Sequence, residues 1–304
     1  MALSPMMQQY FQIKENYQDT ILMFRLGDFY EMFFDDAKTA SKELELVLTG
    51  RDCGEAERAP MCGVPFHSAD GYIAKLVSKG YKVAICEQME DPALAKGIVK
   101  RDVIRVITPG TVIESSMLDE SKNNYLASVC ATNGNVGMCF IDISTGEVNL
   151  TEFSENVEQR VINEMGRYNP TEIILNKEVV SFNSLKDFIS KKLEASVELL
   201  IEEFDFTNAE NVCKEHFNTN DLGTISLNQR NTAVCALGAA LFYLRSTQKR
   251  DLDNIKDINF YSDAKLMNLG ISAIRNLELL ETMRDRDKKG SLLWMLDKTK
   301  TAMG

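Results

Sequence analysis

The sequence predicts an α/β protein built from more than one domain, and three observations lead to this prediction. Strand-like and helix-like segments alternate over residues 1–112. Three strand-like segments follow one another between residues 125 and 153, and helical patterns dominate from residue 251 onward. We therefore expect a mixed α/β domain over 1–112, a linker over 113–124, a second α/β domain over 125–250, and a largely helical region over 251–304.

The composition is that of an ordinary soluble protein, with 44% hydrophobic and 26% charged residues among 304. The start, Met1-Ala2-Leu3-Ser4, does not read as a signal peptide, and no apolar run approaches the ~20 residues of a membrane span. Seven cysteines are widely spaced without a Cys-x-x-Cys pair, and there are two histidines. We expect reduced thiols, no metal site and a cytoplasmic location.

The net charge of −11 opposes nonspecific binding to nucleic acid. Residues 1–110 contain 13 Lys and Arg against 16 Asp and Glu, so most of the acidic excess lies later in the chain. Lys96, Lys100 and Arg101 form a basic stretch that either follows phosphates or is simply solvated. Because the first region is not basic overall, its charge alone does not favour tight binding to nucleic acid.

The first region carries clear helix and strand signals. Ser4-Pro5 is a helix cap followed by proline at the first helical position, and Asp35 or Asp36 is placed to cap a helix that runs to about Glu45. Predicted strands cover 20–26, 29–34, 46–48, 83–86 and 103–107, and a further helix covers 68–79.

The most informative stretch is Gly27-Asp28-Phe29-Tyr30-Glu31-Met32-Phe33-Phe34, which follows the apolar run 21–26. Gly27-Asp28 is a turn signal between two strands. Side chains alternate along a strand, so Phe29, Glu31 and Phe33 share one face. A core does not accept an unpaired carboxylate, and the pattern alone favours a solvent edge for Phe29 and Glu31.

The second region opens with a three-stranded meander over 125–131, 136–143 and 147–153. Helices then alternate with strands at 173–175 and 197–201, and the order βββαβαβα is that of an RNase-H-like fold. A nuclease of this class needs clustered carboxylates to hold divalent ions, and Asp142 on the central strand is the candidate. Glu172 and Glu202-Glu203 flank later strands but do not form an inward-facing set, so a turn role for Asp142 is favoured.

The end of the chain is expected to be largely helical. A long helix covers 227–248, a crossover covers 251–262, and a short strand follows from Lys265. Another helix covers 273–283, and a last one begins near Ser291 and reaches Met303-Gly304.

Motifs along the chain occur in the order found in one family. They are Pro5-Met6-Met7-Gln8-Gln9-Tyr10, Gly27-Asp28-Phe29-Tyr30-Glu31, Pro60-Met61-Cys62-Gly63-Val64-Pro65-Phe66-His67, Ile85-Cys86-Glu87-Gln88, Thr108-Pro109-Gly110-Thr111, Asp142-Ile143-Ser144-Thr145-Gly146 and Arg275-Asn276-Leu277-Glu278. Across nearly its whole length, the sequence resembles the N-terminal part of the MutS family of DNA mismatch recognition proteins.

The resemblance implies a role for several residues. Phe29 would be an aromatic wedge in the minor groove of duplex DNA, and Glu31 the carboxylate that meets the mispaired base. Arg51, Pro60 and Met61 would be further DNA contacts. The domains would be a mismatch-reading domain, an RNase-H-like connector that offers a surface to the MutL repair protein, and the start of the helical core (lever) domain, in a protein that is a homodimer at full length.

The resemblance also implies that the family sequence continues beyond residue 304. The family's ATPase uses a P-loop of the form Gly-x-x-x-x-Gly-Lys-[Ser/Thr], and no such run occurs in this sequence. ATP and Mg²⁺ would therefore belong to the rest of the full-length protein, and this chain is expected to hold no cofactor and to have no enzyme activity. The alternative remains a metal-dependent nuclease centred on Asp142, which would lose activity on Asp142→Asn.

Overall fold

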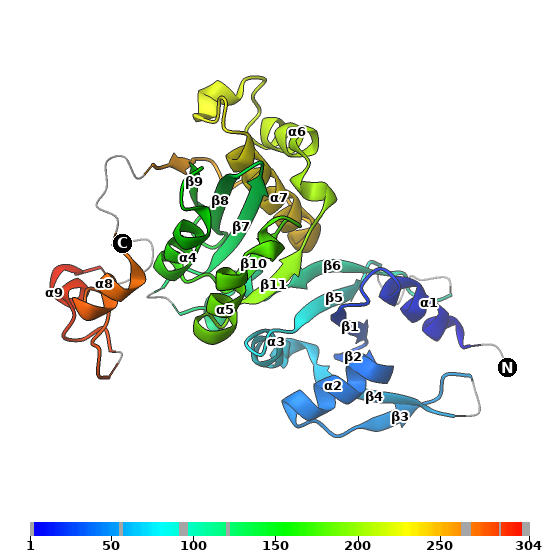
Figure 1. The fold of residues 1–304 in the computed structure, drawn as a ribbon. Helices are drawn as coiled ribbons and strands as arrows, with labels where there is room; N and C mark the ends of the chain where they lie inside the picture. Colours follow the sequence, from blue (N-terminus) through cyan, green and yellow to red (C-terminus); the bar gives the residue numbers. More distant parts are fainter. Residues whose placement is uncertain are drawn as a thin grey trace. The chain divides into compact units, whose positions relative to one another are not determined.

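The computed structural model describes residues 3–54, 57–90, 97–119, 122–262, 269–285 and 287–299. The chain divides into two compact units, each with its own six-stranded sheet (Figure 1). Unit 1 consists of Met1–Met117 together with Leu244–Asp251, and unit 2 consists of Leu118–Tyr243 and Leu252–Gly304. A segment that follows most of unit 2 in the sequence therefore belongs to unit 1.

The sheet of unit 1 has the strand order β3-β4-β2-β1-β5-β6. Strands β1 and β5 are parallel, and the other neighbours are antiparallel. The strands are β1 (Thr20–Leu26), β2 (Phe29–Phe33), β3 (Thr49–Arg51), β4 (Ala59–Pro65), β5 (Lys82–Gln88) and β6 (Arg101–Ile107).

The helices of unit 1 lie on both faces of this sheet. They are α1 (Pro5–Lys14), α2 (Phe34–Leu44) and α3 (Ala69–Val77), with short 3₁₀ turns at Phe66–Ser68, Pro109–Thr111 and Ser115–Met117. Met7 and Tyr10 of α1 are buried with Leu22 and Phe24, so α1 covers the face to which these even-numbered residues of β1 point. Helix α2 covers the other face, where the Cys62 thiol of β4 contacts the Ala37 carbonyl at 3.5 Å.

Two local predictions in this unit are confirmed and two are wrong. Helix α1 begins after Ser4, whose hydroxyl accepts from the Met7 amide at 3.4 Å, and β1 and β2 have nearly the predicted bounds. No aspartate caps α2: its N-cap is Phe33, and Asp36 instead accepts from the Leu22 amide (3.0 Å) and pairs with Lys14 (2.8 Å). Residues 46–48 are not a strand, because the ladder with β4 begins only at Thr49.

The sheet of unit 2 has the order β11-β10-β7-β8-β9-β12. Its strands are β7 (Tyr125–Thr132), β8 (Asn135–Asp142), β9 (Glu147–Phe153), β10 (Glu172–Leu175), β11 (Ser196–Leu199) and β12 (Asn259–Phe260). Strands β7, β8 and β9 form the predicted antiparallel meander, and β10 and β11 extend the sheet in parallel from β7. This topology confirms the mixed α/β fold and its RNase-H-like strand order.

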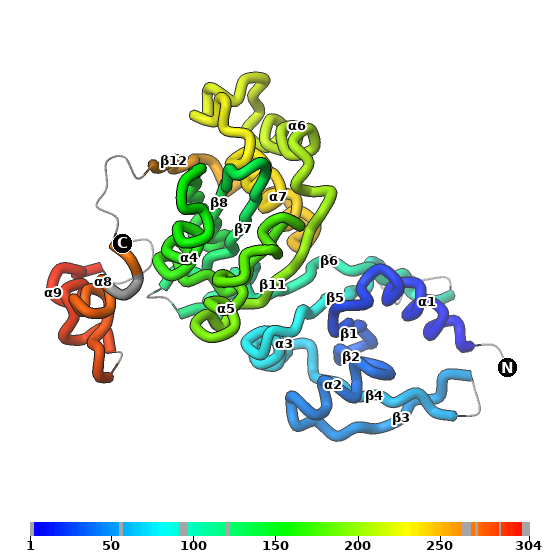
Figure 2. Tube along the Cα trace, viewed as in Figure 1, coloured from blue at the N-terminus to red at the C-terminus, as the bar shows by residue number. Residues whose placement is uncertain are grey.

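Helices cover both faces of this second sheet. They are α4 (Val157–Tyr168), α5 (Asn183–Lys192), α6 (Phe206–His216) and α7 (Asn231–Gln248), with 3₁₀ turns at Val179–Ser181, Glu202–Phe204 and Leu222–Ile225. Helices α4 and α5 lie on the near side in the tube view (Figure 2), where Met165 and Leu185 join the same core cluster as Met138 and Phe140 of β8. Helix α7 packs on the other face, so close to β8 that a Cβ on Gly137 would clash with the Thr232 carbonyl.

The C-terminal helices are shorter than predicted. Helix α8 covers Ile271–Asn276, and the residues that were to continue it as far as 283 form turns. Helix α9 covers Leu292–Leu296 and begins at Ser291, whose hydroxyl accepts from the Trp294 amide at 3.2 Å. The predicted strand near Lys265 and the end at Met303-Gly304 lie outside the described residues.

All seven cysteines are buried and none forms a disulfide. Within the described residues, no helix combines the length and the apolar character needed to cross a membrane.

Candidate nucleic-acid interface

The hairpin of β1 and β2 presents the residues that the sequence analysis singled out. Gly27 has φ +58°, a left-handed conformation that glycine adopts without strain, and it makes the turn that brings Leu26 opposite Phe29. The Asp28 carbonyl accepts a hydrogen bond from the Phe66 amide at 3.0 Å. The turn is therefore tied to the segment that follows β4.

Exposure changes steeply along the face that Phe29 shares with Glu31 and Phe33. The Phe29 ring is 46% exposed, whereas Phe33 is fully buried in the core beneath α1. The opposite face of the same strand is closed, with Tyr30 and Met32 both buried. Phe29 thus lies at the solvent edge, as the alternation pattern predicted, and an aromatic ring is available for contact with a partner.

Glu31 is less exposed than Phe29 and has a cationic partner. Its Oε2 accepts a hydrogen bond from the Arg51 guanidinium, which makes an ion pair between β2 and β3. The Glu31 side chain is 15% exposed and that of Arg51 is 39% exposed. Gly63 lies opposite Glu31 on β4, where a Cβ would come within 3.4 Å of the Glu31 Cγ. The glycine leaves room beside the carboxylate.

The other two predicted DNA contacts fall on opposite faces of the sheet. Directly opposed residues of antiparallel strands point to the same side. Met61 is opposite Phe33, so it shares the face of Phe29, Glu31 and Arg51. Pro60 is one residue away and therefore points to the face covered by α2. Four of the five predicted site residues therefore lie on one face of the sheet, with Glu31 and Arg51 in contact, and Pro60 lies on the other face.

The hairpin is supported from the opposite face by residues that the sequence analysis missed. The Arg25 guanidinium lies 3.6 Å from the centre of the Phe66 ring, donates to the Gly27 carbonyl (2.5 Å) and pairs with Glu87 (3.3 Å). Glu87 also accepts from the Tyr30 hydroxyl, and burial together with this contact raises the pKa of Tyr30 above its usual range. The sequence signal for these supporting contacts was an arginine within an apolar strand, because a cation that is largely buried needs polar partners.

The basic stretch after β5 is only partly a surface feature. Arg101 is buried: it donates to the Arg25 carbonyl (2.7 Å) and to the Gln9 side chain (3.0 Å), and burial lowers its pKa. Lys100 is exposed, and Lys96 lies outside the described residues. Arg101 is therefore a structural cation of the unit 1 core.

Asp142 has the turn role that the sequence favoured. Its Oδ1 accepts from the Ser144 amide (2.8 Å) and hydroxyl (2.6 Å), and its Oδ2 accepts from the Asn124 amide (3.1 Å). Of the later acids, Glu172 accepts from the Tyr243 hydroxyl at 2.8 Å. Within the described ranges, no three His, Cys, Asp or Glu side chains are grouped so that they could hold a metal ion. These contacts give no support to a nuclease centre.

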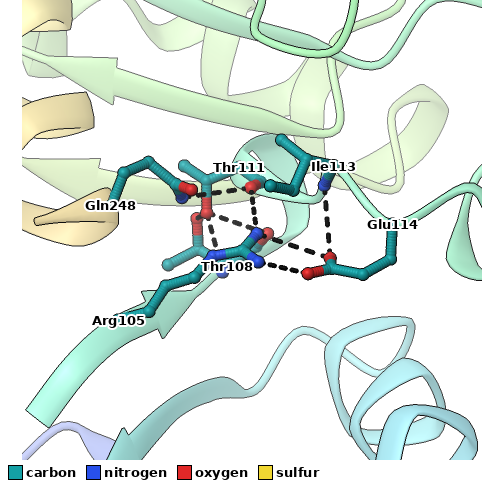
Figure 3. A network of polar contacts seen from close by, with 6 residues as sticks. All are labelled: Arg105, Thr108, Thr111, Ile113, Glu114 and Gln248. Atoms are coloured by element: carbon teal, nitrogen blue, oxygen red, sulfur yellow. Dashed lines mark hydrogen bonds and ion pairs between the residues drawn. The ribbon is translucent and has the colours of Figure 1, made fainter. Parts of the chain in front are cut away.

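A polar network joins the end of β6 to the last turn of α7 within unit 1 (Figure 3). Thr108 and Thr111 form a capping box around Pro109-Gly110. Arg105 pairs with Glu114 and also donates to the Thr111 carbonyl at 3.1 Å. The same carbonyl accepts from Gln248 Nε2 at 3.2 Å. The Thr-Pro-Gly-Thr motif therefore fastens a segment more than 130 residues away in sequence.

These features define a protein with two α/β domains, one bearing an exposed aromatic hairpin and the other an RNase-H-like sheet. Family models give this class its name: one described as MutS domain I matches residues 4–116, and one described as MutS domain II matches residues 124–256. The chain belongs to the MutS family.

Curated relatives agree with this assignment. Proteins named DNA mismatch repair protein MutS are 55% identical in Ruminiclostridium cellulolyticum, 52% in Alkaliphilus oremlandii and 50% in Acetivibrio thermocellus, over 99–100% of this chain. The chain spans 35% of the length of each. Among solved structures, a fowlpox virus resolvase in complex with Holliday junction DNA aligns with 40% of this chain and 97% of its own, at 18% identity and a TM-score of 0.32, which is too weak to support an argument.

Proposed function

We propose that this chain is the mismatch-reading part of a DNA mismatch repair protein, in which Phe29 inserts into the minor groove and Glu31 contacts the mispaired base. The observation that carries the proposal is the exposed Phe29 ring at the start of β2, two residues before a carboxylate on the same face. The family models and the names of the relatives support the same function.

Physical chemistry explains how such a pair of side chains discriminates. A ring pushed between base steps must unstack them and kink the duplex, which costs a few kcal/mol. A mispair is already poorly stacked and deforms more easily, so the same ring meets less resistance there. The minor groove offers a degenerate donor and acceptor pattern, so deformability is a better signal than direct readout for a protein that must accept many mispairs.

Glu31 adds a second condition for binding. A carboxylate near phosphates is repelled unless a base N–H is offered to it, and a regular base pair offers little in the minor groove. The Cβ atoms of Phe29 and Glu31 are about 6.5–7 Å apart, since successive residues of a strand rise about 3.3 Å. The ring and the carboxylate can therefore address the same base.

The remaining functions of the family belong to the proposal for the whole protein. We assign ATP and Mg²⁺ binding, ATP hydrolysis and homodimer formation to parts of the full-length protein that this sequence does not include, and we assign no enzyme activity to this chain. Unit 2 is the proposed connector and the surface offered to the MutL protein. The proposed location is the cytoplasm. Arg51 and Met61 remain proposed DNA contacts, whereas the orientation of Pro60 gives it no direct route to the Phe29 face.

The experiment is a fluorescence-anisotropy titration of a G·T duplex and its G·C twin with the full-length protein and its Phe29→Ala variant. We expect the wild type to prefer the mispair and Phe29→Ala to bind both duplexes alike. Because Phe29 is exposed, the free energy of unfolding of the variant should lie within about 0.5 kcal/mol of the wild-type value.

Phe11→Ala is the matched control, since Phe11 is a 41% exposed phenylalanine on α1 of the same unit. It should keep the mismatch preference. Equal binding of both duplexes by the wild type would contradict the proposed function, and a large loss of stability in Phe29→Ala would show that the ring is part of the core.

A further inference from the structure

The carboxylate proposed to meet a base is already paired in the protein alone. Arg51 comes from β3, the edge strand of the sheet, and its guanidinium reaches across β4 to Oε2 of Glu31. On this face of β4, the small residues Ala59 and Gly63 are opposite Arg51 and Glu31, and Met61 lies between them. The arginine is more than twice as exposed as the carboxylate with which it pairs.

A second cation, Arg101, lies within electrostatic reach of Arg51. Arg101 is fixed by its contacts to the Arg25 carbonyl and the Gln9 side chain, and it lies close enough to Arg51 for the repulsion to contribute, after burial, to its lowered pKa. Without Glu31, no carboxylate of this ion pair would offset the repulsion between Arg51 and Arg101. The ion pair therefore stabilises this arrangement of charges before any DNA is present.

We propose that Arg51 sets the degree of mismatch discrimination by competing with the mispaired base for the Glu31 carboxylate. This inference rests on the proposed function, because it concerns how the same site distinguishes its ligands. Arg51 acts through Glu31 and is a specificity-determining residue.

The two kinds of duplex place different demands on the ion pair. An N–H that a mispair offers to Oε2 of Glu31 has to displace the Arg51 guanidinium, and one offered to Oε1 meets a carboxylate whose charge Arg51 already compensates. In either case the ion pair offsets part of the new hydrogen bond. A matched duplex offers no such donor, so the carboxylate stays neutralised by Arg51 and is repelled less by the phosphates. Both effects reduce the difference between mismatched and matched DNA. Removal of Arg51 should therefore increase that difference.

The test is a double-mutant cycle in the full-length protein with Arg51→Gln, Glu31→Gln and the double variant, each titrated with a G·T duplex and its G·C twin. We expect Arg51→Gln to raise the ratio of mismatched to matched affinity by roughly two- to fivefold, the size expected for a partly exposed ion pair. In the Glu31→Gln background, the same substitution should leave the ratio unchanged. Unfolding of the four proteins without DNA should show a coupling between the two positions.

Arg58→Gln is the charge-matched control, because Arg58 is an exposed arginine just before β4 and Glu31 keeps Arg51 as its partner in this variant. This variant should lower the affinity for both duplexes by the same factor. The proposal is overturned if Arg51→Gln also lowers the affinity for both duplexes by the same factor, with or without Glu31. Arg51 would then be a simple phosphate contact. Equal affinity of the wild-type protein for both duplexes would contradict the proposed function itself. That outcome is distinct from a failure of the proposal about Arg51.

Discussion

Residues 29–33 show how far a short pattern predicts a site. Alternation along the strand correctly placed Phe29, Glu31 and Phe33 on one face, but it could not show that this face is exposed at Phe29 and fully buried at Phe33. That gradient depends on where α1 packs, and the core cluster beneath α1 includes Phe33 and not Phe29. The Arg51 partner of Glu31 was also beyond the pattern, because the ion pair depends on the register of β3 against β4.

Glu31→Ala should bind a matched duplex more tightly than the wild type does. The substitution removes a negative charge and leaves the Arg51 cation without its partner, so the same face repels phosphates less. We expect a gain of up to about fivefold at low salt, shrinking as salt is added, in an anisotropy titration with G·C DNA.

The control for this variant is Asp35→Ala, which removes a carboxylate that is 91% exposed on α2 and pairs with Lys38. It should change binding to the matched duplex much less than Glu31→Ala. A loss of affinity in Glu31→Ala would show that the carboxylate helps to position the hairpin.

At the scale of elements, the sequence predicted strands and helices correctly where they pack and less well where they do not. Residues 46–48 are apolar, yet Val47 is 79% exposed, because strand pairing with β4 starts only at Thr49. A helix was predicted over 273–283, but α8 ends at Asn276, and Leu277, Leu280 and Met283 beyond it are exposed. A short helix without a buried face is marginal, so periodicity alone overestimates its length.

The contact between β8 and α7 makes a specific demand on unit 2. Because a Cβ on Gly137 would clash with the backbone of Thr232, Gly137→Ala should lower the free energy of unfolding by at least about 2 kcal/mol in urea. Gly71→Ala on α3 is the contrast, since its Cβ would meet nothing within 4 Å. That variant should be unchanged or up to about 1 kcal/mol more stable. If Gly137→Ala were no more destabilising than Gly71→Ala, the close packing of α7 on β8 at this position would be contradicted.

At the scale of the whole chain, sequence order and spatial membership differ. The sequence analysis placed residues up to 250 in the second domain, whereas Leu244–Asp251 has its contacts in unit 1. Gln248 is buried against the Thr111 carbonyl, and Lys249 lies 5.2 Å from the centre of the Tyr17 ring. No local pattern reports this return, because it depends on contacts between residues far apart in the sequence.

Gln248→Ala should therefore destabilise unit 1 although residue 248 follows most of unit 2. The loss of its hydrogen bond to Thr111 should lower local stability by about 1 kcal/mol. Hydrogen exchange should report faster exchange for the amides of β6 with little change in the meander of β7, β8 and β9. Arg250→Ala removes an exposed side chain from the same segment and should leave both sets of amides unaffected. Faster exchange confined to the meander would contradict the membership of this segment in unit 1.

The burial of all seven thiols has a practical consequence for spectroscopy. Burial shields the thiols from solvent, and it raises the pKa of Cys62 to about 11 and that of Cys86 to about 12. These two thiols therefore stay protonated near neutral pH. A maleimide dye would then react selectively with one cysteine introduced at an exposed position, such as Asp28→Cys at the tip of the hairpin. Because all seven cysteines of this chain are buried, they can stay in place, and the dye would report the approach of a duplex to Phe29 in real time.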